Sequence, residues 1–149
     1  MKKKISLLAF ITLFIILVCS CKNSIGQSKI KSLQFLNGSF EGESRSIYTS
    51  EPFYGKVKIT IDSNRVMKIN FIIRDSSIHM TFNGSYEKHF IGNEIYIEQC
   101  RKDWKGVQSY PDSLLKYQDL NKIDAISGAT WSYNIFKASA KEAFKKATK

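Results

Sequence analysis

The clearest pattern along the chain is an alternation of apolar and polar residues between Tyr54 and Asp75. In its first half the apolar positions are Val57, Ile59 and Ile61. After a polar turn at 62–65, the second apolar set is Met67, Ile69, Phe71 and Ile73. A period of two is typical of a strand with one buried face. The pattern therefore predicts a β-hairpin whose two apolar sets face the core.

A second pattern, with helical spacing, runs from Trp131 to Ala147 near the end of the chain. Its apolar stripe consists of Phe136, Ala140, Ala143, Phe144 and Ala147. A basic row lies on another side of the same helix at Lys137, Lys141 and Lys145. Such an amphipathic helix packs its apolar stripe on a sheet. We therefore predict an α+β fold, in which a small antiparallel or mixed sheet is packed by this helix and one or two shorter helices.

The middle of the chain gives weaker patterns. Two segments, Ser39–Glu43 and Met80–Tyr86, are predicted to add strands. Residues Asn93–Lys105 are ambiguous, because Ile95 and Ile97 alternate as in a strand whereas Glu94, Glu98 and Arg101 suit an exposed helix face. The type of that segment stays open. Proline favours the first turn of a helix, so we predict that Pro111 opens a short helix over Asp112–Tyr117.

The first twenty residues have the three parts of a secretory signal. A basic tip, Lys2–Lys4, precedes an apolar run, Ile5–Val18, and a small residue stands before a cysteine. The run is shorter than the roughly 20 residues that cross a membrane, although a retained short anchor is the alternative. We predict that residues 1–20 are a signal peptide and that the protein is exported.

The sequence Val18-Cys19-Ser20-Cys21 resembles the lipobox of bacterial lipoproteins. In that family a diacylglycerol is attached to the cysteine and the signal is cut just before it. Cys21 fits this role better than Cys19, because cleavage before Cys21 leaves the small Ser20 at the exit position. The resemblance implies a lipid on Cys21 that holds the protein to a bacterial membrane, on a periplasmic or outer face. The leaflet is left open.

Residues 21–36 are polar and rich in serine and lysine, which predicts a flexible tether. The remainder, 37–149, has the length of one compact domain. Loss of Lys2–Lys4 lowers the net charge from +10 to +7. That excess raises the possibility of nucleic-acid binding, but the lysines are scattered and an exported protein seldom meets nucleic acid. We predict no nucleic-acid partner and assign the basic surface to an anionic membrane.

Cysteine content predicts that the fold holds together without disulfides. Cys19 leaves with the signal and Cys21 is acylated, so Cys100 has no cysteine to pair with. Cys100 is then either a redox thiol or, as is usual for such a residue, a small buried hydrophobe. His79 and His89 lack companion ligands at metal-binding spacing, so no metal site is predicted.

A run of small residues, Ser127-Gly128-Ala129, lies just before the C-terminal helix. Small residues allow a backbone to approach a bulky group closely. The helix begins near Thr130 or Trp131, and its free N–H groups and partial positive charge favour a phosphate there. The alternative is that Ser127 or Thr130 serves only as a helix N-cap. Ser127 as a hydrolase nucleophile is disfavoured, because the strand-turn-helix elbow pattern and a positioned base are missing.

The segment Asp124–Ser132 resembles the flavinylation motif of the FMN-binding domain family. That motif reads Asp, two residues, Ser or Thr, Gly, Ala, Thr, any residue, Ser or Thr. The matching positions are Asp124, Ser127, Gly128, Ala129, Thr130 and Ser132. The family includes subunits of the Rnf and sodium-pumping quinone reductase complexes and lipoproteins of extracellular electron transfer. Looser similarity upstream involves Phe40-Glu41-Gly42, Tyr54–Val57 and Pro111–Asp119.

The resemblance implies that a separate flavin transferase, using FAD and Mg²⁺, joins FMN through its phosphate to the Thr130 hydroxyl. Asp124 would serve recognition by the transferase or hold the loop, and these roles stay open. Ser127 and Ser132 would bond phosphate or backbone. Trp131 is expected to flank the flavin ring because it adjoins the attachment point, and the other aromatic candidates are Tyr54, Trp104 and Tyr110.

These expectations together describe a membrane-tethered electron carrier. A domain of this length has no room for a nicotinamide-binding fold as well, so we expect a relay between redox partner proteins or small electron acceptors rather than a self-sufficient enzyme. Two alternatives remain. The domain would bind FMN without a covalent link, or it would be a flavin-free binding or assembly module of a lipoprotein.

Overall fold

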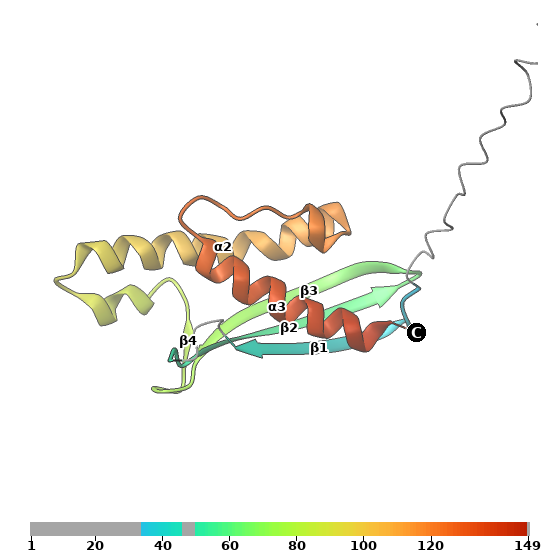
Figure 1. Cartoon of the computed structure of the whole chain (residues 1–149), viewed down its shortest axis with the longest axis horizontal. Coiled ribbons are helices and arrows are strands. Elements are labelled where there is room, and N and C mark those ends of the chain that lie inside the picture. The colour runs from blue at the N-terminus through green and yellow to red at the C-terminus, as the bar shows by residue number, and fades with distance from the viewer. Residues whose placement is uncertain (1–33, 46–49, 149) are drawn as a thin grey trace, which may run out of the picture. The chain divides into compact units, whose positions relative to one another are not determined.

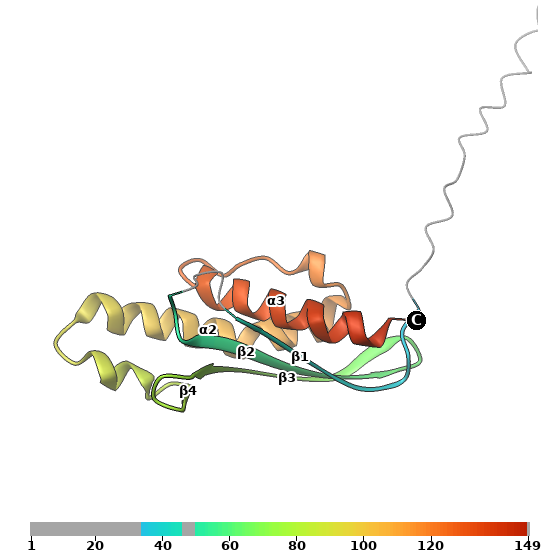
Figure 2. The same cartoon turned by 60° about the horizontal axis from the view of Figure 1, so that its bottom comes forward.

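The computed structural model describes residues 34–45 and 50–148 (Figure 1). Four antiparallel strands form one sheet in the order β1-β2-β3-β4. The strands are β1 (Gly38–Arg45), β2 (Phe53–Asp62), β3 (Arg65–Asp75) and β4 (Met80–Phe82). The helices are α2 (Glu94–Tyr117), α3 (Thr130–Ala147) and the short 3₁₀ helices η2 (Tyr86–Phe90) and η3 (Leu120–Lys122). Both long helices lie on one face of the sheet (Figure 2), which confirms the predicted α+β class.

The predicted hairpin is formed by β2 and β3, and its first apolar set is buried as expected: Val57, Ile59 and Ile61. The second set is wrong at one position. Met67 is 59% exposed, whereas Val66 is buried. A bulge shifts the register, because Thr60 pairs with Lys68 and the next residue, Ile61, pairs with Val66. Met67 is the extra residue of this bulge and has no partner on β2, so its side chain faces outward and Val66 takes the buried position opposite Ile61.

Helix α3 packs directly against the backbone of β1. Gly42 is the point of closest approach, where an added Cβ atom would lie 2.0 Å from the Ser139 carbonyl oxygen and 2.4 Å from the Ala143 nitrogen. In the predicted apolar stripe Phe136 and the three alanines are fully buried, whereas Phe144 is only partly buried. Ile135 and Ser139 extend the buried face. The Ser139 hydroxyl donates to the Ile135 carbonyl at 2.7 Å, so its burial leaves no unpaired polar group. Small residues on both elements therefore set the distance between helix and sheet.

The ambiguous segment Asn93–Lys105 is helical, and it continues without interruption through Pro111 as the 24-residue α2. The prediction that Pro111 opens a short helix is therefore wrong. A proline inside a helix costs about 3 kcal/mol because it removes a backbone hydrogen bond. Val107, Tyr110 and Leu114, which lie on both sides of the proline along the helix, are all buried in the core. Burial of this continuous stripe offsets the cost of the proline.

The predicted strand over Met80–Tyr86 is shorter than expected, since β4 ends at Phe82 and Tyr86 opens η2. At the other end, Phe35 bridges to Thr148, and the Leu36 amide donates to the Ala147 carbonyl at 2.8 Å. The described chain thus enters the domain beside the end of α3. The predicted signal peptide, Cys21 and most of the tether lie outside the described residues. Within the described ranges, no helix is both long enough and apolar enough to cross a membrane.

Candidate functional site

Residues 123–129 form the loop that joins η3 to the start of α3. Its last part is a tight turn, closed by a hydrogen bond of 2.8 Å from the Ala129 amide to the Ile126 carbonyl. Gly128 has a φ of +78°, which a residue with a side chain rarely adopts. An added Cβ atom there would also lie 2.6 Å from Cδ of Lys102. The turn therefore favours glycine at this position, whereas the flexible side chain of Lys102 could move aside for a larger residue.

Two buried or half-buried phenols hold this loop. The Tyr110 hydroxyl donates to the Ala129 carbonyl at 2.9 Å and accepts from the Ile126 amide at 3.1 Å. The Tyr133 hydroxyl donates to the Ile123 carbonyl at 2.7 Å. Burial raises the pKa of Tyr110 above its ordinary value, so its hydroxyl stays protonated and able to donate. The backbone of the loop is thus fixed at both ends.

Thr130 is the first residue of α3, and its side chain is exposed. The N-cap position belongs to Ala129, which has no side-chain acceptor, so the alternative that Ser127 or Thr130 is only an N-cap is wrong. The cap comes from α2 instead. The Asp103 Oδ1 atom accepts from the Ser132 amide at 3.1 Å and from the Ser132 hydroxyl at 2.8 Å. For the first two helical amides, Thr130 and Trp131, the described residues provide no acceptor.

The second oxygen of Asp103 is also engaged, and it ties the carboxylate to the loop. Gln99 Nε2 donates to Asp103 Oδ2 at 2.6 Å and to the Gly128 carbonyl at 2.7 Å. Asp103 is only 3% exposed. Asp103 and Gln99 therefore connect α2 to both sides of Thr130. Sequence reasoning missed both residues, because they lie about one helix turn apart in a segment whose polar residues resemble an ordinary exposed face.

An open pocket of about 340 Å³ lies beside Gln99 and Asp103. Six aromatic residues from several elements line it: Phe53, Phe82, Tyr86, Phe90, Tyr96 and Trp131. Glu51, Gln99, Cys100 and Asp103 complete the lining. The Trp131 ring makes edge contacts with Phe53 and Phe82 at centroid distances of 5.1 and 5.4 Å, and its Nε1 donates to Glu51 Oε2 at 2.8 Å. Trp131 thus forms part of the wall directly next to Thr130.

Tyr86, which also lines the pocket, is held in place by a hydrogen bond to the buried Asp75. Its hydroxyl donates to Asp75 Oδ2 at 2.5 Å, while the amide and hydroxyl of Ser77 donate to Oδ1 at 2.8 and 2.6 Å. Burial alone would raise the pKa of Asp75, but these hydrogen bonds bring it below its ordinary value. Burial and the bond to Asp75 raise the pKa of Tyr86. The Tyr86 hydroxyl therefore stays protonated and fixed.

The remaining candidate residues are distributed as follows. Asp124, Ser127 and Gly128 are exposed, whereas Ala129 and Ser132 are fully buried. Among the aromatic candidates only Trp131 lines the pocket. Tyr110 is buried beneath the loop, Tyr54 lies beside Arg45 and Lys56 on the sheet, and Trp104 borders a smaller cavity. Cys100 is half-buried on the pocket wall, and burial followed by the charge of Asp103 raises its pKa, which favours the thiol over the thiolate.

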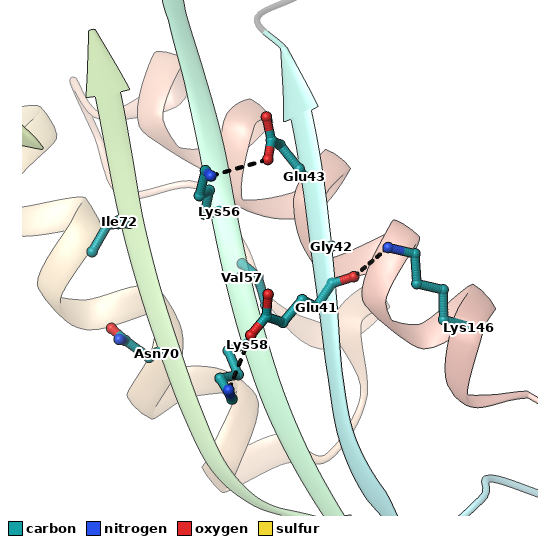
Figure 3. A pocket seen from close by; sticks show the side chains of 9 residues that line it. All are labelled: Glu41, Gly42, Glu43, Lys56, Val57, Lys58, Asn70, Ile72 and Lys146. Carbon is teal, nitrogen blue, oxygen red and sulfur yellow. Dashed lines mark hydrogen bonds and ion pairs between the residues drawn. The ribbon is translucent and has the colours of Figure 1, made fainter. Parts of the chain in front are cut away.

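A second hollow, of about 300 Å³, lies on the outer face of the sheet (Figure 3). Its charged side chains pair with each other: Lys58 with Glu41 at 3.0 Å and Lys56 with Glu43 at 3.3 Å. Lys146 donates to the Glu41 carbonyl at 2.7 Å. None of the motif residues lines this hollow. In the described part of the chain, no group of three or more His, Cys, Asp or Glu residues is placed to hold a metal ion.

Comparison with known proteins agrees with this geometry. Residues 50–145 match the FMN-binding domain. A crystal structure of a protein from Clostridium perfringens shares the fold, with a TM-score of 0.56 and 18% identity over 77% of this chain and 88% of that chain. A solution structure from Clostridium thermocellum has a TM-score of 0.43 and 18% identity over 74% and 90% of the chains. No curated protein matches. The family match spans well over half of the sequence and includes the whole loop, so the chain belongs to the FMN-binding domain family.

Proposed function

We propose that this protein is a membrane-tethered electron-transfer flavoprotein that carries FMN covalently on Thr130. The observation that carries the proposal is the position of Thr130, which is exposed at the start of α3 and directly adjoins Trp131 in the wall of the aromatic pocket. The pocket volume of about 340 Å³ falls in the range of small-molecule sites. Bound FMN would supply one- or two-electron redox chemistry, while the protein holds and orients it.

The start of α3 suits a phosphodiester. The amides of Thr130 and Trp131 are available as donors among the described residues, and they lie at the positive end of the helix dipole. The flat aromatic walls suit a planar, largely apolar ring, because aromatic side chains pack by edge and face contacts. The two features lie side by side, since Thr130 and Trp131 are neighbours. One FMN molecule can thus satisfy both.

The attachment requires a separate flavin transferase. In the proposed reaction, Thr130 Oγ1 forms a bond to the phosphorus of the FMN half of FAD, with Mg²⁺ bound to the transferase. The phosphoanhydride bond to AMP breaks, AMP leaves, and the hydroxyl proton is released. Asp124 is exposed and has no hydrogen bond to the described residues, which supports a role in recognition by the transferase rather than in holding the loop. Tyr110, Tyr133 and Gln99 hold the loop instead.

The route of the chain supports tethering at the end opposite the pocket. Phe35 enters the domain beside Thr148, just after α3 ends, whereas Thr130 begins α3. An α-helix of 18 residues is about 27 Å long at a rise of about 1.5 Å per residue. A lipid on Cys21, in an exported bacterial protein, would therefore be joined through the predicted tether to the end of the domain away from Thr130. The pocket would remain accessible to redox partner proteins or small electron acceptors.

Coexpression of the full chain with a flavin transferase tests this proposal. After denaturing electrophoresis, the wild-type band should fluoresce as flavin, and the Thr130→Ala band should not. The Thr148→Ala band should remain fluorescent as the matched control, because Thr148 lies at the other end of α3 and outside the motif. A dark wild-type band would overturn the covalent link. The absorption spectrum of the native protein would then separate non-covalent FMN binding from a flavin-free assembly module.

A further inference from the structure

We propose that Asp103 lowers the reduction potential of the flavin by placing a fixed negative charge in the wall of the aromatic pocket. This inference rests on the proposed function, because it assigns a role to a residue of the same site. Asp103 lines the pocket and is 3% exposed. In the described part of the chain it forms no ion pair with a lysine, arginine or histidine. Its charge is therefore not cancelled by a neighbouring cation.

The hydrogen bonds to Asp103 suit an ionised carboxylate. Oδ1 accepts from the Ser132 amide and hydroxyl, and Oδ2 accepts from Gln99 Nε2. All three partners act as donors, so the carboxylate needs no proton of its own. The N-terminus of α3 adds a partial positive charge that stabilises an anion at this position. These donors are neutral, so they stabilise a carboxylate without cancelling its charge.

The charge of Asp103 affects the pKa of other groups near the pocket. Burial raises the pKa of Cys100, and Asp103 is the largest charged contributor to the same rise. Asp103 also contributes to the raised pKa of Tyr110, where burial is again the first cause. Reduction adds negative charge to a flavin, and a fixed anion in a medium of low polarity makes that addition less favourable. Asp103 therefore acts as a potential-setting residue rather than as a catalytic one.

The test compares reduction potentials of the flavinylated full chain, measured by spectroelectrochemical titration, for wild type, Asp103→Asn, Asp103→Glu and Glu98→Gln. Glu98 is the matched control, because it carries the same charge on α2 but is exposed and paired with Lys102 at 2.6 Å. Asp103→Asn should raise the potential, Asp103→Glu should keep it near wild type, and Glu98→Gln should leave it unchanged. An unchanged or lowered potential in Asp103→Asn would overturn the proposal.

A second measurement needs no flavin. The alkylation rate of Cys100, followed by peptide mass spectrometry near neutral pH, reports the thiolate fraction in the pocket. Asp103→Asn should speed alkylation relative to wild type and Glu98→Gln should not. Equal rates in Asp103→Asn and wild type would contradict the proposal even if no flavin is attached, whereas absent flavin with faster alkylation would count against the proposed function alone.

If Asp103→Asn does not fold, Gln99→Leu tests the same charge in the opposite direction. This change removes the shortest hydrogen bond to Asp103, so the carboxylate is less screened. The flavin potential should then fall and the alkylation of Cys100 should slow. A higher potential or faster alkylation in Gln99→Leu would contradict the inference.

Discussion

The hydroxyl of Tyr110 donates to the carbonyl of Ala129 at 2.9 Å, so a buried phenol from the middle of α2 fixes the residue that precedes Thr130. The same oxygen accepts from the Ile126 amide at 3.1 Å, which spans the turn between them. Helix α2 thus helps to hold a loop through two residues that lie 16 and 19 positions after Tyr110 in the chain. The presentation of Thr130 depends on this packing and not on the motif alone.

Tyr110→Phe should lower the free energy of unfolding by about 1–3 kcal/mol, because it leaves a partly buried amide and a buried carbonyl without their partner. Denaturant titration followed by circular dichroism measures this change. Tyr117→Phe is the control, since Tyr117 lies on the same helix and is exposed. Equal losses in the two variants would show that the Tyr110 hydroxyl does not hold the loop.

Gly42→Ala should destabilise the domain by about 1–3 kcal/mol or more, because the added methyl group meets the backbone of α3 and not a movable side chain. Thermal and denaturant unfolding provide the measurement. Glu43→Ala, on the exposed face of the same strand, should change stability by much less. A Gly42→Ala protein as stable as wild type would mean that β1 and α3 are not in direct backbone contact.

Acid should weaken the fold partly through Asp75. The pKa of Asp75 in the folded state lies below its ordinary value, so its hydrogen bonds stabilise the protein above about pH 4, the usual range of the unfolded carboxyl group. That stabilisation is lost as the pH falls through the lower, folded pKa. Asp75→Asn should therefore be less stable than wild type near neutral pH and show a shallower loss on acidification.

Ser77→Ala is a milder change than Asp75→Asn, because it removes one hydrogen-bond donor to Asp75, at 2.6 Å, and keeps the carboxyl group. The folded-state pKa of Asp75 in this variant should lie closer to the unfolded value, so the variant's acid loss of stability should be smaller than that of wild type and should be complete at a higher pH. Denaturant titrations across the acid range measure all three proteins. Parallel pH profiles for wild type, Asp75→Asn and Ser77→Ala would refute the role assigned to this carboxylate.

Trp131 should quench the fluorescence of a flavin held in the pocket, because an excited flavin accepts an electron from a neighbouring indole. Trp131→Leu should therefore be brighter than wild type in the native state, and the two proteins should be equally bright after denaturation. Trp104→Leu is the control, since Trp104 is absent from the pocket lining. Brightening in Trp104→Leu but not in Trp131→Leu would place the ring elsewhere.

The sequence predicts those parts of the fold that depend on local patterns. The alternation at Val57, Ile59 and Ile61 predicts the buried face of β2, because that strand is regular throughout. The prediction that Met67 faces the core is wrong because a bulge is a property of strand pairing, which the pattern of a single strand does not contain. The prediction that Pro111 opens a helix is wrong because local helix rules do not include the burial of Tyr110 and Leu114 on either side of it.

The candidate site likewise has a part that the sequence predicts and a part that only the folded structure reveals. The attachment segment is contiguous, so its resemblance to a family motif is visible in the sequence alone. Asp103 and Ser132 are 29 residues apart, and their hydrogen bonds arise only when α2 packs on α3. The aromatic pocket combines residues from strands, a 3₁₀ helix and both long helices, and no spacing rule links Phe53 to Tyr96. Contacts of this kind follow from the tertiary fold.

The most direct test of the central claim is to locate the flavin by mass spectrometry after coexpression with a flavin transferase. Trypsin should release residues 123–137 as one peptide, which contains Ser127, Thr130 and Ser132. The predicted result is a peptide heavier by one FMN less one water, with fragmentation that places the added mass on Thr130. An unmodified peptide from the wild-type protein, or added mass on Ser127 or Ser132, would contradict the account.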